Sequence, residues 1–282
     1  MGTKYIKGKS NMFLLFDIGG TRMRLAVSKD GKEIGEPKIA STPQDDFEQG
    51  MRIFQETAKE LLRGEKPESI IGGLAGTLNR EHAVLLRAPH MRGWVEKPVK
   101  KVLEDLFSVP VVLENDAALA GLGEATKGAG HGSGIVAYVT VSTGVGGVRI
   151  VNGKIDRNAG GFEIGHQIIN YDGEIRTLEE YVSGSALLRR FAKKPEDITD
   201  PEIWEETACL LTHGIHNTIL HWSPEVLVLG GALILQSHFP FESFIKHLTK
   251  HVLQVLPFVP KIKKAELGDV SGLYGALTYP QH

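Results

Sequence analysis

The sequence predicts an α/β fold in two lobes. Apolar stretches typical of buried strands alternate with stretches whose apolar residues fall at helical spacing, which is the pattern of α/β proteins. A strand, a glycine-rich turn, a second strand and a polar turn follow one another from Phe13, and the same scheme returns from Ile135. Because 282 residues exceed the usual size of one domain, we expect two lobes, residues 1–116 and 117–282.

The first lobe is expected to open with a meander of strands followed by a helix. Four apolar residues at 13–16 predict a buried strand, and the alternating apolar residues of 23–27 predict the strand that returns beside it. A polar turn then allows a third strand at 33–40. Apolar residues at helical spacing predict an amphipathic helix over 46–63, which Gly64 would end.

Shorter strands and further helices follow. Short apolar runs predict the strands, and longer amphipathic stretches predict the helices. In chain order these are strands at 69–74 and 83–86, a helix at 96–107, a strand at 109–113 and a helix of small residues at 117–125.

The second lobe repeats the opening scheme and adds more helices. Thr177 and Glu180 fit a capping box, which predicts a helix that starts there and continues through Phe191. The other expected elements are strands at 135–141 and 148–151 around a turn at 142–147, a helix at 202–222 that buries Ala208, Leu211, Ile215 and Ile219, a strand at 226–229, and helices at 241–255 and 272–277.

The composition argues against several classes of partner. A formal net charge of -2 gives no polybasic signal, so nucleic acid and anionic membranes are not expected as partners. The longest apolar run, 226–235, is much shorter than a membrane span, and residues 1–10 lack the apolar core of a signal peptide. We therefore expect a cytoplasmic protein in which the single cysteine, Cys209, is a buried thiol.

Two glycine turns have the composition of phosphate-binding turns. The first contains Gly19, Gly20 and Thr21, and the second contains Thr143, Gly144 and Gly146. Glycine lets backbone N–H groups approach an anion closely, and a threonine hydroxyl adds a donor. Asp17, at the end of the buried strand, could hold hydrated Mg²⁺ beside that anion. An ordinary hairpin turn is the alternative, but the order Asp, Gly, Gly, Thr after an apolar strand favours a nucleotide.

Asn115 and Asp116 have side chains suited to phosphoryl transfer. They follow a predicted strand, at the C-terminal strand end where α/β proteins place their sites. The Asn115 amide can recognise a hydroxyl group, and the Asp116 carboxylate can take a hydroxyl proton while a γ-phosphoryl group transfers in line. The alternative is an Asx cap at a helix start, and the glycine turns favour the catalytic interpretation.

Further polar residues and glycines complete the candidate site. Glu163, His166 and Glu179 offer two carboxylates and an imidazole, which suit the hydroxyl groups of a polyol. The alternatives are a surface pair for Glu163 and His166 and a favourable charge in the first turn of a helix for Glu179. Metal binding by His166 with Glu163 is disfavoured because no cysteine lies nearby. Gly230 and Gly231 follow a buried strand and would let an adenine approach the backbone, or would allow close helix packing.

Taken in chain order, these motifs resemble those of the ROK sugar kinases, a family within the actin, hexokinase and heat-shock ATPase superfamily. The resemblance extends over nearly the whole chain. The motifs that carry it span 17–21, 93–94, 114–117, 143–147, 163–166, 178–179 with 183–184, 229–231 and 272–276.

The resemblance implies a two-lobed actin-like ATPase fold of the ribonuclease H-like type. Each lobe would hold a mixed sheet with flanking helices, and the lobes would close on substrate around an ATP cleft. The last helix, near 272–280, would cross back to the first lobe. The implied site residues are Asp116 as catalytic base, Asn115, Glu163, His166 and Glu179 on sugar hydroxyls, Gly76 in the sugar loop, and Asp17 on Mg²⁺ through water.

Three departures from the family pattern bear on metal and substrate. Many ROK proteins carry a cysteine-rich zinc loop after the Glu-Ile-Gly-His motif, whereas 167–177 is short and cysteine-free here. Zinc is therefore not expected, and His166 is free to contact sugar. Phe162 stands where relatives usually have glycine, and His90 where they often have asparagine, which leaves the choice of sugar open.

We therefore expect an ATP-dependent hexose kinase, with glucose as the foremost substrate and glucose 6-phosphate as its product. The alternative enzyme is an N-acylhexosamine kinase acting on N-acetylmannosamine or N-acetylglucosamine. A non-catalytic sugar sensor or ROK-type regulator is the alternative from another class, disfavoured because the segment before Phe13 is too short for a helix-turn-helix. Polyphosphate in place of ATP, and assembly as a homodimer, stay open.

Overall fold

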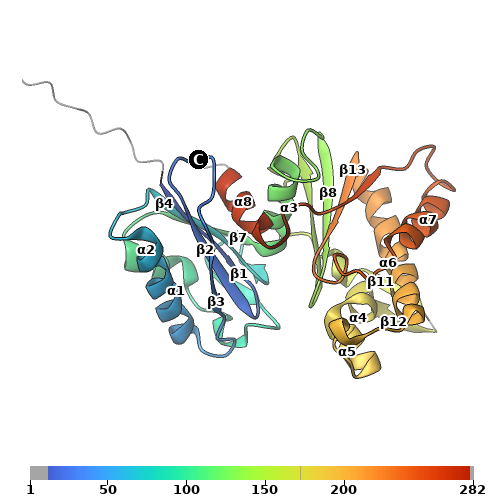
Figure 1. The fold of residues 1–282 in the computed structure, drawn as a ribbon, viewed down its shortest axis with the longest axis horizontal. Helices are drawn as coiled ribbons and strands as arrows, with labels where there is room; N and C mark the ends of the chain where they lie inside the picture. Colours follow the sequence, from blue (N-terminus) through green and yellow to red (C-terminus); the bar gives the residue numbers. More distant parts are fainter. Residues whose placement is uncertain (1–11, 172, 280–282) are drawn as a thin grey trace, which may run out of the picture. The chain divides into compact units, whose positions relative to one another are not determined.

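The computed structural model describes residues 12–171 and 173–279. The chain divides into two compact units: the first comprises residues up to 119 together with Gly272–Leu277, and the second comprises 120–271 with the residues that follow 277. Within the described residues, each unit contains a five-stranded sheet of parallel and antiparallel strands with helices packed on it (Figure 1).

The sheet of the first unit has the strand order β3-β2-β1-β4-β7. Its strands are β1 (Phe13–Ile18), β2 (Arg22–Ser28), β3 (Lys38–Ser41), β4 (Ser69–Leu74) and β7 (Val111–Asn115). The meander β1, β2, β3 is antiparallel, whereas β4 and β7 run parallel to β1. Parallel neighbours bring the ends of β1, β4 and β7 to one edge of the sheet, where sites of α/β proteins form.

Helices α1 (Phe47–Leu62) and α2 (Val99–Phe107) cover one face of this sheet (Figure 1). Their apolar stripes join the strand residues in one buried core. Asp46 caps α1 by accepting a hydrogen bond from the Gln49 N–H at 2.9 Å. The helix ends at Leu62, and Arg63 (φ 49°) and Gly64 (φ 84°) follow in left-handed conformations, within one residue of the predicted end.

The sheet of the second unit repeats the topology of the first. Its order is β10-β9-β8-β13-β14. The strands are β8 (Ile135–Val141), β9 (Val145–Val151), β10 (Lys154–Ile155), β13 (Val226–Gly230) and β14 (Lys261–Lys264). The first three form an antiparallel meander, and β13 and β14 run parallel to β8. The repeat predicted from the sequence is therefore present in the strand order and directions.

The remaining elements complete the two units. Among the longer helices, α6 buries Ala208, Leu211, Ile215 and Ile219 as predicted. The helices are α3 (Asp116–Thr126), α4 (Leu178–Val182), α5 (Gly184–Phe191), α6 (Pro201–Trp222), α7 (Phe241–Val252) and α8 (Ser271–Thr278), and the small hairpins are β5 (Thr77–Leu78) with β6 (Leu85–Arg87) and β11 (Ile168–Tyr171) with β12 (Glu174–Thr177).

Three of the differences from the sequence predictions concern a strand start, a helix and the cysteine. The third strand begins at Lys38 rather than at residue 33, because the Asp30 carboxylate accepts the N–H groups of Lys32 and Glu33 and holds that segment in a turn. The helix predicted from Thr177 to Phe191 is broken at Ser183, which is extended and caps α5 through the Ala186 N–H. Finally, Cys209 is exposed because it lies on the face of α6 away from the buried stripe.

A buried carboxylate that the sequence did not reveal holds two loop segments of the second unit together. Glu124 in α3 is completely buried. Its Oε2 accepts the N–H groups of Ala129 at 3.0 Å and Glu266 at 3.1 Å, and its Oε1 accepts the Leu267 N–H at 2.8 Å. The carboxylate therefore connects the segment after α3 to the loop that precedes α8.

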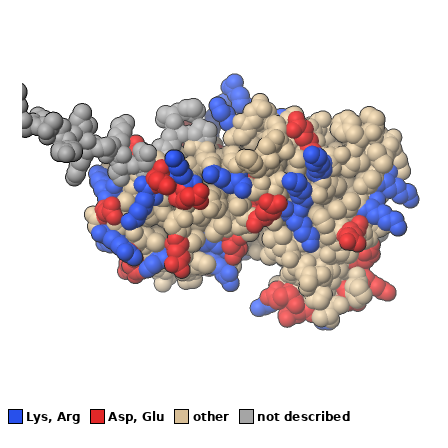
Figure 2. All heavy atoms as spheres, turned by 45° about the horizontal axis from the view of Figure 1, so that its top comes forward, with Lys and Arg blue, Asp and Glu red and all other residues tan. Residues whose placement is uncertain are grey.

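On the surface, basic and acidic side chains are interspersed across the face drawn in Figure 2. This mixture agrees with the formal net charge of -2. Within the part of the chain that the structure describes, no helix combines the length and the apolar character needed to cross a bilayer.

Candidate active site

The first glycine turn joins β1 to β2 and is held by its own backbone and by a glutamine. The Gly19 N–H donates to the Arg22 carbonyl at 2.9 Å, and the Gln44 amide donates to the Gly20 carbonyl at 2.7 Å. A Cβ on Gly20 would lie 2.6 Å from the Cβ of His90, so only glycine fits here. Among the described residues, the N–H groups of Gly20 and Thr21 have no protein acceptor, which leaves two donors for an anion.

Asp17 lies beside this turn near the end of β1. It pairs with Arg24 across the β1–β2 ladder, with 3.6 Å between Asp17 Oδ2 and Arg24 Nη1. A Cβ on Gly272 of α8 would lie 3.1 Å from the Asp17 Cγ, so a glycine at the start of that helix leaves room for the carboxylate. One hard carboxylate next to a glycine turn with free N–H donors fits Mg²⁺, which takes one or two carboxylates and keeps several waters.

Asn115 and Asp116 lie where β7 passes into α3. The Asn115 Oδ1 accepts the Ala118 N–H at 3.0 Å, so this residue caps α3 as the alternative interpretation predicted. The Asn115 Nδ2 donates to the Gly76 carbonyl at 3.1 Å, which leaves its second amide hydrogen for a ligand. Capping and hydroxyl recognition are therefore compatible at Asn115.

Asp116 is the first residue of α3 and is only partly exposed. Its Oδ1 accepts the Ala117 N–H at 2.8 Å. Burial raises the pKa of the Asp116 carboxyl above its ordinary value, and the hydrogen bond from Ala117 offsets only part of that effect. A carboxylate with a raised pKa is a stronger base than an ordinary surface aspartate.

Gly76 follows β4 and occupies a backbone position that requires glycine. Its φ is +134°, and an added Cβ would lie 2.4 Å from the Arg87 carbonyl oxygen. The carbonyl of Gly76 is the acceptor of the Asn115 amide, so the loop after β4 is tied to the start of α3. In the first unit, the structure thus brings Gly76, Asn115 and Asp116 together.

The second glycine turn joins β8 to β9 and is shorter than the sequence predicted. Strand β9 begins at Val145, and Gly146 pairs with Thr140 inside the ladder, so Gly146 belongs to the strand and not to the turn. The prediction placed both Gly146 and Gly147 in the turn because glycine is rare in strands. In the structure both lie in β9, where the absence of a side chain at Gly147 leaves room for Ile164. Within the described residues, the N–H groups of Thr143 and Gly144 have no protein acceptor.

Glu179, in the first turn of α4, contacts this second turn. Its Oε2 accepts the Val145 N–H at 2.7 Å, and a Cβ on Gly144 would lie 2.7 Å from the same oxygen. Two backbone N–H groups at the start of α5 add to this contact, because Gly184 donates to the Ser142 carbonyl at 2.7 Å and Ser185 to the Thr143 carbonyl at 3.2 Å. Apart from the Ser183-Gly184 motif, no local pattern in the sequence indicates these contacts.

Glu163 and His166 form a partly exposed pair at the 3₁₀ turn Ile164–His166. The Glu163 Oε2 lies 3.2 Å from the His166 Nδ1, and both side chains are about half exposed. A cavity of about 250 Å³ lies beside Glu163, and the rings of Phe162 and Trp222, 5.1 Å apart and edge to face, are part of its lining. A half-exposed pair is what the surface-pair alternative predicted, and contact of these two side chains with sugar stays a prediction.

Gly230 and Gly231, at the end of β13, lie against β8 of the same unit. A Cβ on Gly230 would lie 2.7 Å from the Tyr138 hydroxyl, and one on Gly231, with φ +90°, would lie 2.3 Å from the Val141 carbonyl. Close packing therefore requires both glycines, although the neighbour is a strand and not a helix. An approach of adenine to this backbone stays a prediction.

Each unit thus assembles its own part of the predicted site. In the first unit these residues are Asp17, Gly19, Gly20, Thr21, Gly76, Asn115 and Asp116, and in the second they are Thr143, Gly144, Glu163, His166, Glu179, Gly230 and Gly231. Arg24, which pairs with Asp17, and Gln44, which supports the first turn, were not predicted from the sequence. Arg24 could have been found, because a hairpin closed at residues 19–21 places it opposite Asp17.

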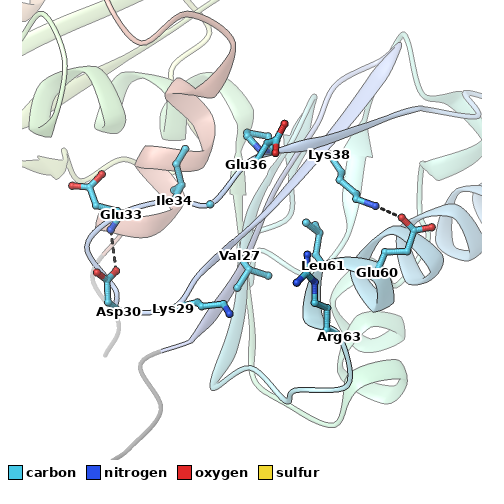
Figure 3. A pocket seen from close by; sticks show the side chains of 12 residues that line it. Val27, Lys29, Asp30, Glu33, Ile34, Glu36, Lys38, Glu60, Leu61 and Arg63 are labelled. Carbon is cyan, nitrogen blue, oxygen red and sulfur yellow. Dashed lines mark hydrogen bonds and ion pairs between the residues drawn. The ribbon is translucent and has the colours of Figure 1, made fainter.

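A larger hollow in the first unit contains none of these residues. It has a volume of about 630 Å³ and lies between the segment 29–38 and the end of α1 (Figure 3). Lys29, Lys38 and Arg63 face it together with acidic residues, and Lys38 is ion-paired with Glu60. Because charges of both signs line it, this hollow does not select an anion such as a nucleotide.

Comparisons with known proteins agree with these features. A model of the ROK family matches residues 14–281. An N-acetyl-D-glucosamine kinase of Mannheimia succiniciproducens is 30% identical, covering 93% of this chain and 96% of that protein. A glucokinase of Thermotoga maritima is also 30% identical, covering 92% and 94%. A solved ROK family glucokinase of Streptomyces griseus, in complex with glucose and AMPPNP, has a TM-score of 0.80 at 25% identity, covering 94% and 98%. The chain therefore belongs to the ROK family and is a sugar kinase with the two-lobed actin-like ATPase fold.

Proposed function

We propose that this kinase transfers the γ-phosphoryl group of ATP to the 6-hydroxyl of a hexose, with glucose as the foremost substrate and Asp116 as the general base. The observation that carries the proposal is the Asp116 carboxyl, which lies at the C-terminal end of β7 and has a raised pKa because of burial. The same unit also contains a glycine turn with two N–H groups available to an anion. The glucokinase relative supports the choice of sugar.

The proposed step is an in-line displacement at phosphorus. The 6-hydroxyl of the sugar donates a hydrogen bond to Asp116, which accepts the proton as the oxygen bonds to the γ-phosphorus and the bond to the leaving ADP breaks. The burial that raises the pKa of Asp116 makes it a better proton acceptor near neutral pH. Positioning and electrostatic stabilisation of the transferring group supply the rest of the rate gain.

The other residues have proposed roles in binding. Asn115, Glu163, His166 and Glu179 would contact sugar hydroxyls, with Gly76 in the sugar loop. The N–H groups of Gly20, Thr21, Thr143 and Gly144 would hold the phosphates, and Gly230 and Gly231 would lie near the adenine. Asp17 would hold Mg²⁺ through water, and the ion, when bound, neutralises charge on the phosphates.

An N-acylhexosamine is the second candidate substrate, and one observation favours it. The cavity beside Glu163 is lined by the aromatic rings of Phe162 and Trp222. Among the described residues, Glu163 is the one acidic residue that lines it, and its other polar side chains are those of Gln167, Thr218 and His221. Such a cavity suits an uncharged acyl group better than an ionic one. The N-acetyl-D-glucosamine kinase relative supports this candidate as well.

The experiment that tests the proposal is a coupled assay of ADP release with a panel of sugars. Glucose, mannose, fructose, N-acetylglucosamine and N-acetylmannosamine are each supplied with ATP and Mg²⁺. We expect sugar-dependent ADP formation with the highest kcat/KM for glucose, or for an N-acyl sugar if the second candidate holds. Binding of a sugar without any ADP formation would contradict both and would favour the sugar-sensor alternative. Because polyphosphate releases no ADP, the donor is identified by measuring formation of the sugar phosphate itself, with either ATP or polyphosphate supplied.

The pH dependence of this activity is a further prediction. Protonated Asp116 cannot accept the hydroxyl proton, so log(kcat/KM) should fall with unit slope on the acid side. Because burial raises the pKa of Asp116, the midpoint of this fall should lie above 3.8, the ordinary value for aspartate. Circular dichroism at each pH would exclude acid unfolding. A midpoint at or below the ordinary value would contradict the assignment of Asp116 as a desolvated base.

A further inference from the structure

Three hydrogen bonds connect the start of helices α4 and α5 to the second glycine turn. We call Glu179, Gly184 and Ser185 the α4–α5 clasp. The Glu179 carboxylate accepts the Val145 N–H at 2.7 Å, and the N–H groups of Gly184 and Ser185 donate to Ser142 and Thr143. The turn is therefore held at both ends, because Ser142 precedes it and Val145 opens β9.

The Glu179 contact lies at the point where the β8–β9 ladder opens. Val145 pairs with Val141, but the Val141 carbonyl accepts the Leu233 N–H at 3.1 Å and the Val145 N–H is turned to Glu179. A charged acceptor forms a stronger hydrogen bond than a neutral carbonyl. The Glu179 carboxylate thus fixes the direction in which this end of the turn leaves the sheet.

Fixing the turn matters for the N–H groups that it leaves free. Within the described residues, the N–H groups of Thr143 and Gly144 have no protein acceptor, and both lie between the two ends held by the clasp. An anion binds more tightly to donors that are already oriented, because their ordering need not occur on binding. The clasp therefore prepares these donors for a phosphate.

We propose that Glu179 is a positioning residue for the nucleotide: its carboxylate braces the 142–145 turn in the orientation that binds the phosphates of ATP. This inference rests on the proposed function, in which the turn binds the phosphates of ATP and Glu179 contacts the sugar. One carboxylate then serves both substrates. Sugar bound to Glu179 and phosphate bound to the turn would each change the affinity of the other site by the same factor.

The brace and the charge of Glu179 act on nucleotide affinity in opposite directions. A carboxylate beside a phosphate-binding turn repels an anion, so removing its charge should tighten nucleotide binding. Removing its acceptor oxygen should weaken binding, because the Val145 N–H loses its partner. Glu179→Gln removes the charge and keeps an amide oxygen as acceptor, whereas Glu179→Ala removes both. The ratio of their dissociation constants for the nucleotide therefore isolates the effect of the hydrogen bond from the Val145 N–H.

The test measures binding of Mg²⁺ and AMPPNP by isothermal titration calorimetry without any sugar. We expect Glu179→Ala to bind AMPPNP about 3- to 10-fold more weakly than Glu179→Gln, as expected for the loss of one hydrogen bond. Glu179→Gln should bind AMPPNP at least as tightly as the wild-type protein. Glu180→Ala is the matched control, because Glu180 caps α4 through Thr177 but, among the described residues, makes no hydrogen bond with the turn.

Equal affinities of Glu179→Ala and Glu179→Gln would overturn the inference, since a residue that only binds sugar cannot act when sugar is absent. Weaker binding by Glu180→Ala to the same degree would also overturn it, because the effect would then come from a loosened helix. The assay of ADP release by wild-type protein separates this result from the proposed function. If the wild-type protein phosphorylates sugar but Glu179→Ala and Glu179→Gln bind AMPPNP equally, the proposed function stands and the inference about Glu179 is wrong.

Discussion

Replacing Asp116 with asparagine is expected to lower kcat by about 10²- to 10⁴-fold, the usual contribution of a general base. Asparagine has nearly the same shape and can still accept the Ala117 N–H that Asp116 accepts. The KM for sugar and the affinity for AMPPNP should therefore change little. Initial rates of ADP formation at saturating sugar and ATP measure the loss. A variant that keeps near-wild-type kcat would show that Asp116 is not the base.

The same variant should be at least as stable as the wild-type protein. Because the pKa of Asp116 is raised in the folded state, its contribution to stability is present below the unfolded pKa and is lost as pH rises through the folded pKa. At neutral pH the buried charge therefore costs stability, and Asp116→Asn removes that cost. Thermal unfolding near pH 7 and near pH 4 provides the control: the gain should shrink at the lower pH. Unfolding at a lower temperature than wild type would mean that lost activity reflects damage to the fold.

Replacing Glu124 with alanine should lower the free energy of unfolding by at least about 3 kcal/mol. The change leaves the N–H groups of Ala129, Glu266 and Leu267 without the acceptor that a fully buried side chain supplies. Each unsatisfied buried donor costs about 1–3 kcal/mol, and the space left by the carboxylate adds to the loss. Urea unfolding followed by fluorescence measures the difference.

Two variants show whether the effect comes from these hydrogen bonds. Glu124→Gln keeps the volume but replaces one acceptor oxygen by an NH₂ group. Its free energy of unfolding should therefore lie between those of the wild type and Glu124→Ala. Glu56→Ala removes an exposed carboxylate from α1 and should change stability by less than about 0.5 kcal/mol. A Glu124→Ala variant as stable as Glu56→Ala would mean that water or a shifted loop replaces the carboxylate.

The sequence predicted the strands and helices whose patterns are long and strong. The apolar run at 69–74 and the amphipathic stretch at 202–222 became β4 and α6 within one residue at each end. The repeated scheme predicted two sheets of equal topology, because each copy carries the same order of strand, turn and strand. Weak patterns failed: 261–264 is too short and too charged to be recognised as β14, which pairs with β13 only through long-range contacts.

The candidate site could be predicted to the level of motifs but not of contacts. Glycines and acidic residues at strand ends revealed the two turns and Asp116, since each motif is local in sequence. The support of the second turn by Glu179, 34 residues further along the chain, depends on how α4 packs and leaves no local pattern. The place of Gly146 in β9 was missed for a similar reason, because strand pairing decided it and composition did not.

The most direct test of the account is a crystal structure of the protein with glucose, Mg²⁺ and AMPPNP bound. With Asp116 as the base, a carboxylate oxygen of Asp116 should lie within hydrogen-bond distance, about 2.6–3.2 Å, of the sugar 6-hydroxyl. The N–H groups of Gly20, Thr21, Thr143 and Gly144 should also face the phosphates. A complex in which Asp116 contacts no sugar hydroxyl, or in which the phosphates bind away from both glycine turns, would contradict the account.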